Sequence, residues 1–600
     1  MSSELKSIFF RVALVSTIVA AMPIGFAKTP AQAEKVLRVA FPAPDDGFDM
    51  VKTFNFYSGN VADVIFERLV QYDYLSNPVK LVPATAQSLP TIEKNGQVYT
   101  FKIKSGIYFT DDPAFKGKRR ELVAEDYVYS IKRILDPKNH APSFSFIDNK
   151  LVGANALVEQ ANKTGQFNYD AKIEGVKALD KYTIQFKLTQ PDYNFPYILA
   201  YSTFGATARE VVEYYKDQLG MHPVGTGPYM LSRYVPRSKI ELIANPDYRG
   251  FVWNFKSTGT AWDNQLVKQM SGKPMPQIGK VNISIIEEEQ SRWLAFQSKQ
   301  LDFDTLTSSA IPKALDQNNQ LNAAMQQKGI RLYANKEAEV TYTMFNMRDP
   351  VVGGNSLDKI ALRRAVAMSF NLNEYIRILR KGQAGRAEML VPAGVNGHNP
   401  NYRSSIGYNP VLANKLLDHF GYKKGTDGYR RFPNGKALTL KINTESGSSS
   451  VMYSELWKKN LDAIGIRAEF KVSNFADNLK AATQCQYMMW SGAWHADYPE
   501  GENFTQLLYG ANIIGRGNQS CYKSAAYDGL YQQAMKLAPD QRTPFYEKMS
   551  RQVEADNPWI LQDTRIRNWV IQPEVQGFKA HPIMNTNWQY LDIAPSQQNK

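Results

Sequence analysis

Short segments with a strand-like period alternate along the whole chain with segments that have a helical period, and this interleaving constrains the fold most. Apolar and polar residues alternate with a period of two, as in half-buried strands, in segments 98–103, 183–188, 438–442 and 467–472. Apolar residues recur at the spacing of an amphipathic helix in segments 127–135, 362–370 and 545–553. The two patterns together predict a mixed α/β fold over most of the chain.

The composition is typical of a globular chain large enough for several domains. The 600 residues include 21% charged and 43% hydrophobic side chains, which excludes a disordered tail protein and a multi-span membrane protein. The net charge of +14 is distributed along the chain, and basic residues do not gather in one segment. We therefore expect no nucleic-acid partner.

Residues 1–33 have the pattern of an export signal. Two basic residues precede the apolar run 12–26, and a small-x-small triplet ends at Ala33. We expect cleavage after Ala33, with cleavage after Ala27 as the alternative. The alternative interpretation of the whole segment is a retained membrane anchor. Because no cysteine lies near either position, we expect no lipoprotein, and we place the mature chain in the periplasm.

The two cysteines, Cys485 and Cys521, are too few for a disulfide scaffold or a cysteine-rich zinc site. An oxidising compartment would allow them to form one disulfide. Two separate buried thiols are the alternative.

Signals of enzyme chemistry are missing. Segment 225–229 is rich in glycine, but no Lys-Ser/Thr pair follows it, so it is no phosphate-binding P-loop. We find no nucleophile elbow and no zinc-binding His-Glu-x-x-His helix, and the six histidines are scattered singly. We expect no enzyme and no cofactor; a secreted hydrolase is the alternative of a different class.

In two segments the apolar residues follow neither the strand-like nor the helical spacing. Segment 251–279 is polar and contains two prolines, and segment 111–120 carries four basic residues. We interpret the basic segment as a solvated loop in preference to a binding patch.

A series of short motifs follows in order along nearly the whole mature chain. Together they resemble the extracytoplasmic solute-binding proteins of family 5, the peptide/nickel type of receptor for ABC importers. The motifs lie in segments 66–72, 81–84, 99–109, 124–133, 224–229, 245–248, 362–366, 408–417, 494–499, 503–504 and 527–528.

The resemblance implies an α/β, bilobal, type II periplasmic-binding-protein fold with an additional inserted domain. The first lobe would be built from residues 34–70, 200–305 and 560–600. The inserted domain would cover residues 71–199, and the second lobe residues 306–559.

The resemblance also implies a peptide site around Asp497. In peptide-binding relatives the matching aspartate pairs with the ligand's α-amino group, and an ammonium partner would offset the cost of burying a carboxylate. The extended residues Gly492, Ala493, Trp494 and His495 would add the peptide as a strand, and Trp494 would line a pocket. The alternatives are a turn cap for Asp497 and plain core packing for Trp494.

The rest of the site is expected on other segments. Phe56, Tyr57 and Ser58 lie in the segment that would face the peptide from the first lobe. Arg386 is a candidate for binding the ligand carboxylate, although solvated surface is its alternative. Segment 500–502 departs from the family's usual Asp-Pro-Glu sequence, which weakens the transfer of ligand identity.

The resemblance implies a periplasmic receptor that captures oligopeptides between two lobes and delivers them to a membrane permease and its ATPase. We expect a monomer. A nickel complex, haem, an oligosaccharide or a peptide antibiotic is the alternative ligand on the same scaffold, and a surface sensor or adhesin is an alternative role.

Overall fold

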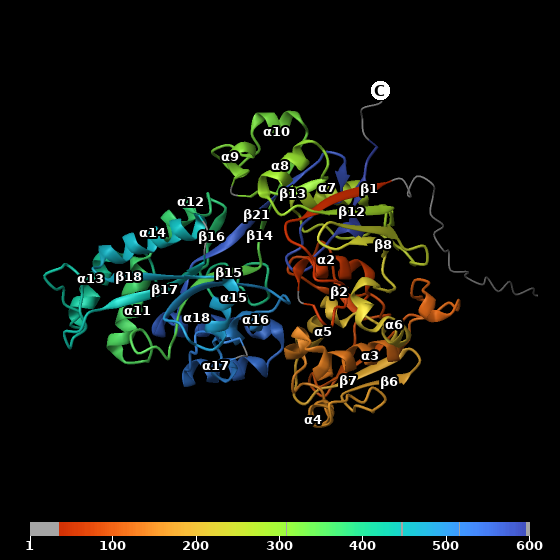
Figure 1. The fold of residues 1–600 in the computed structure, drawn as a ribbon, viewed down its shortest axis with the longest axis horizontal. Helices are drawn as coiled ribbons and strands as arrows, with labels where there is room; N and C mark the ends of the chain where they lie inside the picture. Colours follow the sequence, from red (N-terminus) through yellow and green to blue (C-terminus); the bar gives the residue numbers. More distant parts are fainter. Residues whose placement is uncertain (1–34, 54, 308, 446–447, 515–516, 596–600) are drawn as a thin grey trace, which may run out of the picture.

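The computed structural model describes residues 35–53, 55–307, 309–445, 448–514 and 517–595. Figure 1 shows two bodies side by side, with the N-terminal part of the chain in one and residues of the middle part in the other. The expected export signal, 1–33, lies outside the described residues. None of the helices in the described ranges combines the length and the apolar character needed to cross a membrane.

The body that contains the start of the described chain, here called the first body, holds three of the larger sheets. One sheet has the order β1(Val36–Phe41), β12(Lys280–Ile285), β9(Lys239–Ala244) and β8(Tyr229–Val235), with β1 parallel to β12. A second has the order β4(Thr91–Glu93), β5(Val98–Lys102), β7(Thr183–Lys187) and β6(Val176–Asp180). A third has the order β13(Phe303–Thr305), β21(Asp563–Ile571) and β14(Arg331–Lys336). Its α-helices are α2(Phe56–Ile65), α3(Ala124–Leu135), α4(Ala154–Thr164), α5(Phe195–Ile198), α6(Arg209–Tyr215), α7(Ala261–Met270), α8(Glu289–Gln297), α9(Ile311–Ala314) and α10(Ala323–Gln327).

The other body, here called the second body, is built on one sheet of five strands. Its order is β18(Arg467–Ser473), β17(Thr439–Glu445), β19(Met489–His495), β15(Glu339–Phe345) and β20(Trp559–Leu561). Its α-helices are α11(Leu357–Ser369), α12(Leu372–Ile378), α13(Pro410–His419), α14(Ser448–Ala463), α15(Phe475–Thr483), α16(Glu502–Thr505), α17(Ala525–Met535) and α18(Thr543–Asp556). The short strand β16(Ala384–Arg386) pairs with the start of β21. Two-stranded pairs complete the set: β2(Val70–Tyr72) with β3(Leu81–Pro83), β10(Phe251–Val252) with β11(Pro274–Met275), and β22(Val575–Gln576) with β23(Asp592–Ile593).

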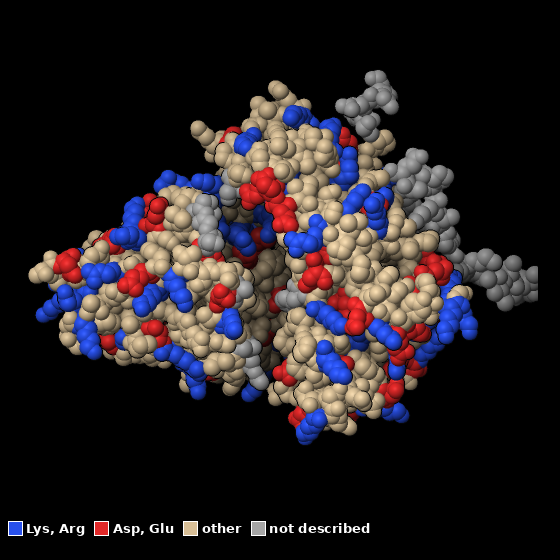
Figure 2. All heavy atoms as spheres, in the orientation of Figure 1, with Lys and Arg blue, Asp and Glu red and all other residues tan. Residues whose placement is uncertain are grey.

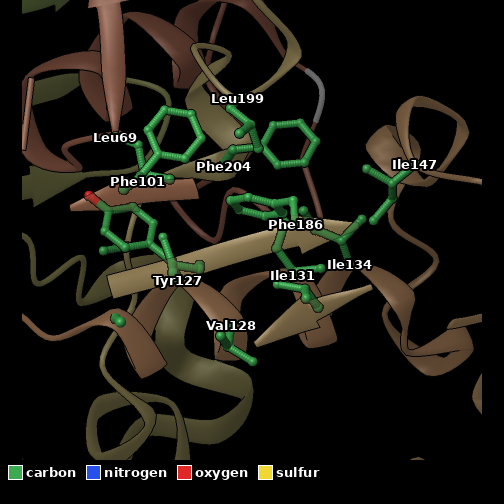
Figure 3. Close-up of a cluster of buried hydrophobic side chains, with 14 of the residues drawn as sticks. Leu69, Phe101, Tyr127, Val128, Ile131, Ile134, Ile147, Phe186, Leu199 and Phe204 are labelled. Carbon is green, nitrogen blue, oxygen red and sulfur yellow. The ribbon is translucent and has the colours of Figure 1, made fainter. Parts of the chain in front are cut away.

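The predicted strands and helices are present, which confirms the mixed α/β class. In α3, the main-chain N–H of Val123 donates to the carboxylate of Asp126 at 2.8 Å, and Asp136 followed by Pro137 ends the helix. The apolar stripe predicted on this helix packs against β5 and β7, where Phe101 and Phe186 lie (Figure 3). Burying this stripe, at roughly 25 cal/mol for each Å² of apolar surface, fixes the helix to the sheet.

The glycine-rich segment 225–229 packs closely against the end of α2. The N–H of Gly227 donates to the carbonyl of Ile65, at the end of α2, at 2.8 Å. A Cβ atom added at Gly225 or at Gly227 would collide with the backbone of Ile65 or Val64. Only glycine allows these two pieces of main chain to approach so closely.

The two stretches without a clean period have ordered structure. Segment 251–279 contains α7 between the paired strands β10 and β11, and its Trp253 is fully buried beside Tyr74 and Tyr590. In segment 111–120, Arg120 pairs with Asp126 at 2.6 Å, while Lys116 and Lys118 are exposed. Helix α7 was not predicted, although its Trp262, Leu266 and Met270 recur at helical spacing.

The chain crosses between the bodies at two places. It passes from β14 in the first body into β15 in the second, and it returns from β20 into β21. Residues 311–336 stay with the first body, because β14 pairs with β21 and Met325 packs with Trp293 and Val570. We therefore propose that the lobes divide near residues 337 and 562, instead of at residue 306.

Candidate functional site

A cavity of about 490 Å³ lies where the two bodies meet. Its lining comes from the first body, from the second body and from the strands that cross between them. Figure 2 shows the hollow between the bodies, with charged side chains of both signs visible at its edge. Among the lining residues are Phe56, Tyr57, Tyr201, Glu337, Glu339, His495, Asp497, Arg565, Arg567, Trp569, Phe578 and Asn585.

The N-terminus of α2 supplies part of the apolar wall. The side-chain oxygen of Asn55 accepts hydrogen bonds from the N–H groups of Tyr57 at 2.8 Å and Ser58 at 3.3 Å, which caps the helix. This cap fixes Phe56 and Tyr57 in the cavity lining. Phe56 packs edge-on against Tyr57, with ring centroids 5.5 Å apart, and it is still 53% exposed, so a large apolar surface remains at the cavity.

Two ion pairs line the cavity on the crossing strands. Arg565 Nε lies 2.6 Å from Glu339 Oε1, and Arg567 Nη2 lies 3.2 Å from Glu337 Oε2. His495 Nε2 lies 3.8 Å from the same Glu337 oxygen. Because residues two apart on a strand share a face, both pairs point to one side of the crossing. The cavity is therefore lined by both arginine and glutamate side chains, and these lie on the segments that connect the two bodies.

Asp497 follows the end of β19, and Asn503 holds its carboxylate. The N–H of Asp497 donates to Asn503 Oδ1 at 3.0 Å, and Asn503 Nδ2 donates to Asp497 Oδ2 at 2.9 Å. Desolvation raises the pKa of Asp497 to about 6, with the hydrogen bond from Asn503 opposing the shift and the charge of Glu502 adding to it. Burial raises the pKa of Tyr201, and the charge of Asp497 adds to that shift. The carboxylate thus faces the first body from the second.

The fold and this geometry coincide with one family of proteins. The model of the bacterial extracellular solute-binding proteins, family 5 Middle, matches residues 80–516. The chain belongs to family 5 of these solute-binding proteins. The resemblance predicted from its motifs is therefore confirmed.

Named relatives span nearly the whole chain. A protein of Pseudomonas aeruginosa named di/tripeptide-binding protein 2 is 25% identical over 560 residues, which is 92% of this chain and 93% of the relative. The heme-binding protein A of Haemophilus influenzae is 23% identical over 531 residues, which is 86% of this chain and 85% of the relative.

Solved structures support the same fold. The ABC transporter-associated periplasmic binding protein DppA from Helicobacter pylori, solved in complex with the peptide STSA, superposes with a TM-score of 0.68 at 22% identity. The match covers 93% of this chain and 98% of that one. The predicted α/β bilobal fold is thus confirmed.

The structure brings four of the predicted site residues of this family 5 protein into the cavity lining: Phe56, Tyr57, His495 and Asp497. Their roles toward a ligand stay predictions. Ser58 is fully buried, and its hydroxyl donates to Asp46 Oδ1 at 2.7 Å, behind the wall and away from the cavity.

The residues just before His495 lie outside the lining. In β19, Gly492 pairs with Tyr342 of β15 and Ala493 pairs with Thr341, so one side of their main chain is already used. Trp494 packs against the core of the second body, and its Nε1 donates to Asn503 Oδ1 at 3.0 Å. Trp494 therefore acts on Asp497 through Asn503 and does not line the pocket.

The prediction for Arg386 needs correction. Its guanidinium donates to the carbonyl of Ile406 and lies 3.4 Å from Glu388 Oε2. It lines a separate cavity of about 40 Å³, because β16 pairs with β21 at Asp563, two residues before the strand reaches the large cavity. The cations at the large cavity are Arg565 and Arg567.

Sequence reasoning missed these arginines and their glutamate partners. The sequence does contain a pattern that indicates them. An apolar residue separates two arginines in 565–567, and an alanine separates two glutamates in 337–339. Such alternation places the charges on one face of a strand. The sequence does not show that both strands border the same cavity.

Proposed function

We propose that this chain is the extracytoplasmic receptor of an ABC importer and that it captures short peptides in the cavity between its bodies. The observation that carries the proposal is a half-buried carboxylate, Asp497, in a cavity shared by two bodies. An α-ammonium group matches this carboxylate in charge, size and hydrogen bonding. The names of the relatives, which refer to peptides in several cases, support the same ligand class.

The size and lining of the cavity favour a short peptide over a long one. A volume of about 490 Å³ lies in the range of about 300–1,000 Å³ that is usual for small ligands. The aromatic wall formed by Phe56, Tyr57 and Trp569 can receive varied side chains without a fixed set of hydrogen bonds.

The opposite end of the ligand requires a cation. Arg565 and Arg567 line the cavity, and each is held by a glutamate. We assign the ligand carboxylate to this pair of arginines, because a guanidinium presents several donors and can serve two carboxylates at once.

The remaining parts of the proposal concern the cell. The pattern in residues 1–33 favours export to the periplasm with removal of the signal. We propose that the receptor acts as a monomer, releases its ligand unchanged and passes it to a membrane permease with its ATPase.

Mass spectrometry of the molecules that copurify with the protein tests the ligand class. The expected result is a mixture of intact short peptides with free amino termini, released when the protein is denatured. Haem, a nickel complex or an oligosaccharide as the main copurifying molecule would contradict the proposal. Cleaved products that accumulate with time would instead indicate a hydrolase.

Peptide affinity is expected to fall below pH 6. The pKa of Asp497 is raised to about 6 in the unliganded protein, and a proton on the carboxylate competes with the ligand's ammonium group. Affinity should be flat above this pKa and decrease toward about tenfold per pH unit below it, since protonated Asp497 must release its proton on binding. Calorimetry at pH 5 in buffers of different ionisation enthalpy should detect this proton release.

The control is Asp497→Asn, which keeps the shape of the side chain and removes the titration. In this variant the affinity should be low and nearly constant from pH 5 to pH 7. A pH profile that is the same in both proteins would assign the titration to another group.

A further inference from the structure

One side chain from the first body is buried in a polar network of the second. Asn194 stands at the N-cap position of α5 without a side-chain capping bond. Its Nδ2 donates instead to Glu502 Oε2 at 3.2 Å and to Glu500 Oε2 at 3.4 Å. Arg542 Nη1 in turn donates to Asn194 Oδ1 at 3.0 Å. Figure 1 shows α5 of the first body next to α16 of the second.

This contact is buried on both sides. Asn194 is 2% exposed, Glu500 0% and Arg542 1%. Burial raises the pKa of Glu500 to about 7, and the charge of Arg542 opposes the shift. Polar groups in such surroundings interact strongly, and each one left without a partner is costly.

The second body satisfies its own charges without Asn194. Arg542 Nη1 pairs with Glu500 Oε2 at 3.2 Å. Tyr546 donates to Glu500 Oε1 at 2.6 Å, and Tyr531 donates to Glu502 Oε1 at 2.8 Å. If the bodies separate, the ion pair stays intact and water can replace the amide of Asn194. The contact can therefore form and break without leaving an unpaired charge.

An amide suits this position for a specific chemical reason. Its NH₂ group donates to the two carboxylates, and its oxygen accepts from the guanidinium. A carboxylate at the same position would lose the donor and would add a third negative charge beside Glu500 and Glu502. On the side of the first body, the main-chain N–H of Asn194 donates to Asp192 Oδ1 at 2.9 Å, and Asp192 pairs with Lys150 at 2.6 Å, so the backbone that carries this side chain is held by contacts within the first body.

The network is continuous with the ligand site. Glu500 follows Asp497 by three positions, and between them Tyr498 packs into the core cluster of the first body, where it is 5% exposed. The turn that carries Asp497 is thus in contact with the first body at Tyr498 and linked to it again through Glu500.

We propose that Asn194 is the closing contact of this receptor: its amide docks between Glu500, Glu502 and Arg542 and holds the two bodies together around the bound ligand. The effect of this contact on ligand affinity rests on the proposed function. Since the contact does not touch the ligand, it should raise the affinity for every ligand by the same factor, by increasing the fraction of closed protein.

Two variants, Asn194→Ala and Asn194→Asp, test this inference in the full-length protein. The alanine removes the contact, and the aspartate adds repulsion. We expect dissociation constants about 5- to 30-fold higher for Asn194→Ala and roughly 100-fold or more higher for Asn194→Asp. The factor should be the same for two peptides of different sequence. Asn162→Ala, at an exposed position of α4, is the matched control.

A measurement without any ligand makes the test independent of the proposed function. Nitroxide labels at Lys163→Cys and Lys536→Cys, both exposed and located on different bodies, report the distance between the bodies by electron–electron resonance. The wild-type background should show a population at short distance that decreases in Asn194→Ala and is lost in Asn194→Asp. Thermal unfolding of each variant verifies that it is folded.

Unchanged distances in both Asn194 variants would overturn the closing contact, whatever the ligand is. If the distances change in the variants but no protein binds peptide, wild type included, the closing contact would stand and the proposed peptide ligand would be wrong. A loss of affinity that differs between peptides would also contradict the inference, because it would place Asn194 against the ligand.

Discussion

Replacing Asp497 by alanine is expected to weaken the binding of a short peptide with a free amino terminus by about 2–5 kcal/mol. This corresponds to roughly 30- to 5,000-fold in the dissociation constant. The effect is large because the ammonium group would stay in a desolvated cavity without its counter-charge. Isothermal calorimetry at pH 7.5 with one defined tripeptide measures it.

An N-terminally acetylated version of the same tripeptide provides the ligand control. It should bind the wild type weakly and should lose little further affinity in Asp497→Ala. Asp540→Asn, an exposed carboxylate elsewhere in the second body, should leave the affinity unchanged. Equal affinity of wild type and Asp497→Ala for the free peptide would remove Asp497 from the ligand site.

Asp497→Asn, which keeps an acceptor for the amide of Asn503, should not reduce the stability of the unliganded protein. The pKa of Asp497 is raised in the folded state, so ionised Asp497 opposes folding above its unfolded pKa of about 4. That cost is fully present above pH 6 and disappears as the pH falls through the unfolded pKa. A melting temperature at pH 7.5 equal to or above that of the wild type, together with lost affinity, would indicate a residue kept for binding.

Removing the disulfide is expected to be the largest change in stability. The structure joins Cys485 and Cys521, whose Cα atoms are 6.2 Å apart, across a sequence separation of 36. Closing a loop of this length contributes roughly 4 kcal/mol in the chain-entropy model. The loop contains β19, the turn with Asp497 and α16, so its loss should loosen one wall of the cavity.

Hydrogen exchange of a Cys485→Ser/Cys521→Ser variant measures this effect segment by segment. Both sulfurs are buried, so the double variant is a cleaner test than adding a reductant to the native protein. Segment 486–520 should exchange faster by a factor that corresponds to about 2–4 kcal/mol, while β1 and β12 of the first body keep their rates. Equal exchange in segment 486–520 of both proteins would refute the prediction.

Much of the architecture could be predicted from local patterns. The period of two in 98–103 and 183–188 gave β5 and β7, and the helical period in 127–135 gave α3. These patterns can be recognised because one face of each element is buried. In a strand that face carries every second residue, and in a helix it carries every third or fourth residue. Helix α7 was not predicted, although Trp262, Leu266 and Met270 recur at helical spacing, because this short pattern stands alone in a segment that is otherwise polar and irregular.

The ligand site was predictable only in part. Asp497 was predicted from a short motif, and it lies in the cavity lining. Arg386 was chosen for its charge and its place in the chain, and the structure holds it in another cavity. Charge along a sequence does not tell which loop ends beside which strand.

The amino-acid sequence by itself determined the mixed α/β class, the family and the segment that carries Asp497, because these depend on periodicity and on motifs within a few residues. The tertiary structure alone decided that Arg565 and Arg567 lie at the cavity and that Asn194 meets Glu500, 306 positions away. Such contacts depend on how the whole chain folds back between two bodies, and no local pattern of residues encodes that distance in space.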